Sequence, residues 1–106
     1  MAEKPRLQQI QDMINDNPHD AMLWYMLAME YASMGDDAQA ARTFEELLKA
    51  RPEYVPAYMQ AGRTLVRLGR DAEAREVYER GIAMAQQKQD LHARDEMQGM
   101  LAGLTD

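Results

Sequence analysis

The sequence predicts an all-α fold, a right-handed α-solenoid of helix-turn-helix repeats with a capping helix at each end. Three observations predict it. Apolar residues recur at the three- and four-residue spacing of one helix face, in two stripes: Trp24, Leu27, Ala28 and Tyr31, then Ala40, Phe44, Leu47 and Leu48. Gly35 separates the stripes and Pro52 follows the second, and both residue types end helices. The pattern then recurs 34 residues later.

The 34-residue repeat can be followed position by position. The matched pairs are Trp24 and Tyr58, Ala28 and Gly62, Gly35 and Gly69, Ala40 and Ala74, and Phe44 and Tyr78. Pro18 lies one period before Pro52, so residues 4–17 correspond to the second helix of a preceding repeat. A two-helix unit cannot bury its apolar face alone, and neighbouring units therefore stack into a solenoid.

We expect one domain over residues 1–106 with six helices. They are a capping helix in 4–17, helices over 20–34 and 37–50 in repeat 1 (20–52), helices over 55–68 and 71–88 in repeat 2 (55–88), and a C-terminal capping helix in 90–104. Asp90 is the expected N-cap of the last helix. Gly62 lies inside a predicted helix, where glycine costs about 1 kcal/mol relative to alanine. We expect close approach of the next helix at Ala74 to compensate for this cost.

The first repeat resembles the tetratricopeptide repeat. Six of the eight signature residues of that family are present in order: Trp24, Leu27, Tyr31, Ala40, Phe44 and Pro52. Ala28 and Leu47 replace the other two. The second repeat is more diverged, with Gln86 in place of the proline. The resemblance covers residues 4–88 and implies a small tetratricopeptide protein of the bacterial type, whose repeats serve as a scaffold for protein–protein interaction and peptide binding.

Composition narrows the class of protein further. The 106 residues include no cysteine, which excludes disulfides, zinc–thiolate sites and thiol nucleophiles. The first fifteen residues contain no continuous apolar run, so we expect no signal peptide, no membrane span and a cytoplasmic location. The net charge of −6 disfavours nucleic acid as a partner, because an acidic protein repels phosphates.

Residues for catalysis are sparse. The two histidines, His19 and His92, lie in segments at opposite ends of the predicted stack, so we expect no metal site. Ser33 is the only serine, and no base is placed beside it to make it a nucleophile. Gly35 and Gly69 are isolated turn glycines, not a phosphate-binding loop. We therefore expect no enzyme activity and no cofactor.

A second apolar stripe on the helix over 20–34 gives the candidate binding site. In tetratricopeptide proteins the first helix of each repeat lines a concave groove that binds peptides. The resemblance implies that the groove positions are Met22, Tyr25, Met26, Met29 and Ser33 in repeat 1 and Met59, Arg63, Val66 and Arg67 in repeat 2. The lysine and asparagine by which some family members grip a C-terminal carboxylate are absent; Tyr25, Met29, Met59 and Arg63 occupy those places.

The groove residues predict the chemistry of a partner. Methionines accept varied apolar surfaces, and Arg63 and Arg67 are one helical turn apart, where they could hold a carboxylate. We therefore expect a protein or peptide partner with apolar and acidic residues.

Other interpretations remain open from the sequence. Met22 and Met26 could pack on Met13 and Ile14 as core, and the arginines could be solvated or pair with Glu30 or an acid of the last helix. The chain could instead self-associate as a homodimer through the groove or through the C-terminal helix. That helix could also fill the groove of its own molecule.

Overall fold

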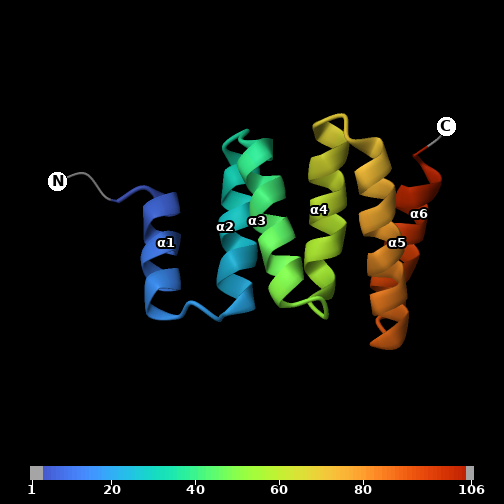
Figure 1. Ribbon diagram of the computed structural model, residues 1–106, viewed down its shortest axis with the longest axis horizontal. Helices are drawn as coiled ribbons and strands as arrows, with labels where there is room; N and C mark the ends of the chain where they lie inside the picture. Colours follow the sequence, from blue (N-terminus) through green and yellow to red (C-terminus); the bar gives the residue numbers. More distant parts are fainter. Residues whose placement is uncertain (1–3, 105–106) are drawn as a thin grey trace.

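In the computed structural model, which describes residues 4–104, the chain is a row of antiparallel helices (Figure 1). The helices are α1 (Arg6–Asp16), α2 (Ala21–Ser33), α3 (Asp37–Ala50), α4 (Val55–Arg67), α5 (Asp71–Gln87) and α6 (Leu91–Ala102), and no strand occurs within these residues. The molecule is elongated, with extents of 50 × 28 × 20 Å. The predicted all-α solenoid is confirmed.

The helices form two layers, and the layers define a concave side. Helices α2, α4 and α6 contact one another in succession and form an inner layer. Helices α3 and α5 pack on them in an outer layer and do not contact each other within the described residues. Because the inner helices are closer together than the outer ones, the stack curves toward the inner layer. We call the exposed surface of α2, α4 and α6 the concave face.

The turns after α2 and α4 follow from glycine. Gly35 has φ 83° and Gly69 has φ 75°, a left-handed conformation that glycine adopts without steric cost. After Gly35, the backbone N–H of Asp36 donates to the carbonyl of Tyr31 at 2.9 Å, which closes the end of α2. The Asp36 carboxylate then accepts from the N–H of Gln39 at 3.2 Å and caps α3.

The core is divided into two apolar clusters. The larger one joins α2 to α6 through residues such as Phe44, Tyr58, Ala74 and Met97, and the smaller one comprises Ile10, Ile14, Leu23 and Leu27. Ala28 of α2 and Ala40 of α3 are fully buried in the larger cluster. The smaller cluster holds α1 against α2.

The reason for a glycine at position 62 differs from the one expected. A Cβ atom there would lie 2.2 Å from Cε1 of Tyr78, and the nearest side-chain atoms all belong to that ring, not to Ala74. Gly81 has a similar role that the sequence analysis missed. Its Cβ would meet Cβ of Tyr58 and Sδ of Met97, each at 2.6 Å. The two glycines therefore let aromatic side chains lie directly on helix backbones where α4, α5 and α6 meet.

Candidate partner-binding face

The predicted groove positions line three hollows along the concave face. The first, of about 540 Å³, lies beside α2 on its α1 side and is lined by Arg6, Tyr25, Met26, Met29, Glu30 and Ser33. The second, of about 280 Å³, joins α2, α4 and α6 and includes Tyr25, Met59, Gln60, His92 and Glu96. The third, of about 340 Å³, lies between α4 and the end of α6 and includes Arg63, Val66, Arg67, Tyr78, Met100 and Leu104. Of the nine predicted residues, Met22 alone lines none of these hollows.

Tyr25 belongs to two hollows of this face, because it lines both the first and the second. Its ring meets Phe44 edge-on at a centroid distance of 6.2 Å and lies 5.7 Å from the ring of Tyr54. Burial raises the pKa of the Tyr25 phenol above its ordinary value, so the hydroxyl is neutral near pH 7. Tyr25 thus presents a rigid aromatic wall with a polar tip.

The methionines of α2 differ in their surroundings. Met26 is half-buried against the cluster of Ile10 and Ile14, so the interpretation of this residue as core is partly right. Met29 is half-buried against the larger cluster. Met22, by contrast, is 55% exposed, and Met13 on α1 is also exposed. Of these α2 methionines, Met26 and Met29 line the first hollow, and each exposes only part of its side chain.

The two arginines of α4 are not equivalent. Arg67 is paired with the carboxylate of Asp37, at the start of α3, through Nε and Nη2 at 3.0–3.2 Å. Its partner is thus neither Glu30 nor an acid of the last helix, and Glu30 is paired with Arg6 at 3.0 Å. Arg63 is exposed and forms no ion pair or hydrogen bond within residues 4–104. Within the described part of the chain, the expected pair of cations therefore presents one guanidinium without an ion-pair partner.

Helix α6 contributes residues that the sequence analysis did not assign to the face. It packs on α5 and α4 and does not contact α2, so it extends the inner layer and leaves the first hollow open. His92 Nε2 lies 2.5 Å from Glu96 Oε1 in the second hollow, and Met100 lines the third. The apolar stripe of the expected C-terminal capping helix is the sequence signal for these contacts.

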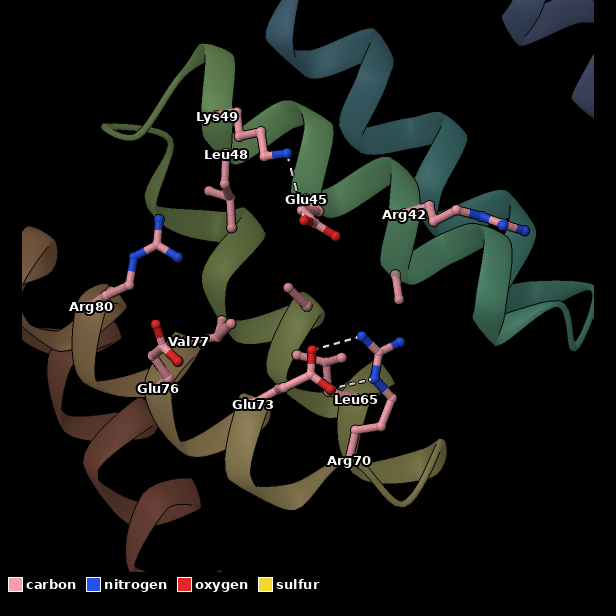
Figure 2. Close-up of a pocket in the computed structure, with 12 residues that line it drawn as sticks. Arg42, Glu45, Leu48, Lys49, Leu65, Arg70, Glu73, Glu76, Val77 and Arg80 are labelled. Carbon is pink, nitrogen blue, oxygen red and sulfur yellow. Dashed lines mark hydrogen bonds and ion pairs between the residues drawn. The ribbon is translucent and has the colours of Figure 1, made fainter.

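A further hollow of about 270 Å³ lies on the opposite, outer side (Figure 2). Leu48 of α3, Leu65 of α4 and Val77 of α5 form its apolar lining. Charged side chains of α3 and α5 surround it, and several pair within the chain: Lys49 with Glu45 at 3.6 Å and Arg70 with Glu73 at 2.7 Å. No spacing pattern in the sequence indicates this hollow, because residues from three helices form it.

Two classes of site are not found in the described part of the chain. No group of three or more histidine, aspartate or glutamate side chains there is arranged to hold a metal ion. No helix among residues 4–104 has both the length and the apolar character needed to cross a bilayer.

The two-layer stack of helix pairs, with glycine turns and an open concave face, defines a helical-repeat protein-interaction domain. The model of the tetratricopeptide repeat matches residues 25–88, and the chain belongs to this family. Proteins of the family bind other proteins through such repeats, so we assign the chain to this general class.

Solved structures are similar over most of the chain. A protein of Bordetella parapertussis, solved in solution, superposes with a TM-score of 0.83 at 26% identity and covers 96% of this chain and 89% of its own. The tetratricopeptide repeat domain protein of Salinibacter ruber, solved by NMR, gives a TM-score of 0.78 at 30% identity over 82% of this chain and 88% of its own.

One curated relative also matches. The mRNA 3′-end-processing protein of Schizosaccharomyces pombe is 42% identical over 48 residues, which is 45% of this chain. The chain spans 6% of the length of that relative.

Proposed function

We propose that the protein recruits a partner by holding an extended or helical segment of it on the concave face. The observation that carries this proposal is that the chain's own last helix leaves α2 uncovered, because α6 continues the inner layer beside α4. The three hollows then follow one another from the α1 side of α2 to the end of α6. A segment lying along them would cross all three inner helices.

The side chains of the face support an apolar contact. Met29 and Met59 are half-buried, so each already packs on the core and has a free edge, and Val66 on α4 is exposed. Methionine adapts its shape to the partner, whereas Tyr25 is held by its aromatic neighbours and offers a fixed surface. Complete burial of one such side chain contributes about 1.5–3 kcal/mol, so a few of them suffice for a specific complex.

A selection of peptides from a random display library, followed by titration into protein with labelled methionine methyl groups, tests the proposal. Selected peptides should shift the methyl resonances of Met26, Met29 and Met59. The variant Met29→Gln should weaken the binding of these peptides by about tenfold, since it places an amide at an apolar contact. Met34→Gln is the matched control, because Met34 is exposed at the end of α2 and lines none of the three hollows. Peptides whose binding is unchanged by Met29→Gln would contradict the proposal.

Self-association is a second candidate function, favoured by the two ends of the stack. Helix α2 has no inner-layer neighbour on its α1 side, where Met22 is exposed, and Leu91 is exposed on α6 at the other end. A second copy could cover one of these surfaces. In sedimentation velocity over a wide concentration range, a homodimer that uses α6 should be lost in Leu91→Lys. A sedimentation coefficient of the monomer at every concentration would exclude this alternative.

A further inference from the structure

The third hollow of the concave face differs from the others in its charge. Among residues 4–104, its lining includes two arginines and no acidic residue. The first hollow contains Glu30, the second contains Asp90 and Glu96, and the outer hollow contains three glutamates. The chain as a whole carries a net charge of −6. A hollow with only cationic charge on such a protein is therefore a local exception, suited to an anion.

One cation in this hollow is free and one is not. The charge of Arg67 is compensated by the two oxygens of Asp37. Arg63, one turn earlier, is exposed and has no ion-pair partner among the described residues. An arginine presents several N–H donors in a planar fork that matches the two oxygens of a carboxylate.

A second donor comes from Tyr78 on α5. This side chain is only 2% exposed, and its hydroxyl forms no hydrogen bond within residues 4–104. No buried polar side-chain atom in that part of the chain lacks a partner, so the hydroxyl must reach the surface, at the hollow that Tyr78 lines. The hydroxyl of the comparable buried residue Tyr58 donates to the carbonyl of Pro52 at 2.6 Å. Tyr78 is therefore a buried ring whose hydroxyl has no hydrogen-bond partner in the described part of the chain.

The charge state of Tyr78 makes it a donor. Burial raises the pKa of the phenol, and the positive charges of Arg63 and Arg67, which line the same hollow, oppose that effect. The hydroxyl is protonated near pH 7, and a protonated phenol donates to an anion. Phe44 occupies the same position of the first repeat, so a phenylalanine ring fills this site of the fold without a hydroxyl.

We propose that this hollow binds an aspartate or glutamate side chain of the partner segment, with Arg63 and the Tyr78 hydroxyl as donors to the carboxylate. A neighbouring apolar side chain of the segment would lie on Val66 and Met100. The inference rests on the proposed function and names the partner's chemistry. One free guanidinium and one neutral hydroxyl match the single charge of a carboxylate better than the double charge of a phosphate.

The position of Arg63 within α4 indicates an acid inside the segment and not at its end. Arg63 lies in the middle of the helix, with Met59 of the second hollow one turn before it and Val66 about one turn after it. Apolar surface is thus available on both sides of the cation. A segment that uses both sides continues past its acid in each direction.

Peptide selection tests this inference. The peptides are displayed as insertions between two folded domains, so that no free carboxyl terminus is presented. Peptides selected on the wild-type protein should be enriched in aspartate or glutamate beside an apolar residue. Peptides selected on the Arg63→Gln variant should not be enriched in aspartate or glutamate. For one selected peptide, fluorescence anisotropy should show about tenfold weaker binding to Arg63→Gln and about threefold weaker binding to Tyr78→Phe. Arg42→Gln on the outer layer, also an exposed helical arginine, should bind like the wild type.

A matched peptide with asparagine or glutamine in place of its acid completes the test. It should bind weakly and equally to wild-type protein and Arg63→Gln, because this peptide has no carboxylate for Arg63 to bind. Selected peptides that depend on Met29 but show no acid and no effect of Arg63→Gln would overturn the anion site and leave the proposed function intact. Tighter binding of phosphoserine in place of the acid, or an acid enriched only at a free C-terminus, would also overturn it. Peptides indifferent to Met29→Gln would contradict the proposed function itself.

Discussion

Gly62 and Gly81 determine how closely the aromatic side chains of the second repeat approach a helix backbone. At position 62 the ring of Tyr78 occupies the space of a Cβ atom, and at position 81 Tyr58 and Met97 do so. Each glycine weakens its own helix, since glycine costs about 1 kcal/mol relative to alanine. The gain is a nearly complete burial of two tyrosine rings, which would otherwise hold the helices apart.

Replacement of Gly62 by alanine should therefore destabilise the fold even though alanine favours helix. The new methyl group would overlap the Tyr78 ring, with an overpacking cost of about 1–3 kcal/mol that exceeds the propensity gain of about 1 kcal/mol. We expect a net loss of up to about 2 kcal/mol in the free energy of unfolding, measured by urea denaturation.

Gly99→Ala is the control for this prediction. Gly99 is also inside a helix, α6, but nothing lies within 4 Å of its Cβ position. This substitution should stabilise the protein by up to about 1 kcal/mol. An equal stabilisation by Gly62→Ala would show that the Tyr78 ring can move aside at no cost.

At the residue scale, the sequence predicts which side chains share a helix face, but not which residues of other helices they contact. Eight of the nine groove residues that the tetratricopeptide resemblance implies line hollows of the concave face. The helical period explains why those of one helix lie together, because spacing along one helix determines which side chains share a face. The Arg67–Asp37 pair joins residues 30 apart in the chain. The hollow that Tyr78 of α5 lines is formed together with residues of α4 and the end of α6. Such contacts require the crossing geometry of the helices, which spacing does not contain.

At the scale of elements, helix limits could be predicted because their signals are local. A glycine at positive φ, an aspartate cap and a proline each act within one turn, and α3 begins at Asp37 and ends at Ala50 as expected. Helix α5 ends at Gln87, one residue before the expected limit. It has 17 residues where α3 has 14, since the proline that follows the first repeat is replaced in the second.

The longer α5 changes the spacing between the second repeat and α6. The N-caps of α2 and α4, Asp20 and Tyr54, are 34 residues apart (54 − 20), whereas Asp90 of α6 follows 36 residues after Tyr54 (90 − 54). Gln89, with φ 60°, forms the altered turn before α6. A fixed period of 34 therefore misaligns α6 and does not identify its contribution to the second and third hollows.

At the scale of the whole molecule, the helices are stacked along a single direction. Each helix contacts those next to it, and no contact joins α1 or α2 to α5 or α6 within residues 4–104. Stability in such a molecule is approximately a sum of local terms between neighbours. The concave face gains from this arrangement, because a partner that crosses α2, α4 and α6 would connect parts of the chain that do not otherwise support one another.

The stack therefore predicts a gradient of local stability that is lowest at α1. Helix α1 contacts only α2, through the smaller cluster of Ile10 and Ile14, and has no share in the larger core. Native-state hydrogen exchange should give its amides a free energy of opening about 2 kcal/mol or more below that of α4. Ile10→Ala should lower protection in α1 and leave α4 nearly unchanged, whereas Leu65→Ala, in the larger core, should lower it in both α4 and α5. Equal loss of protection in every helix after Ile10→Ala would instead mean that the two clusters unfold as one cooperative unit.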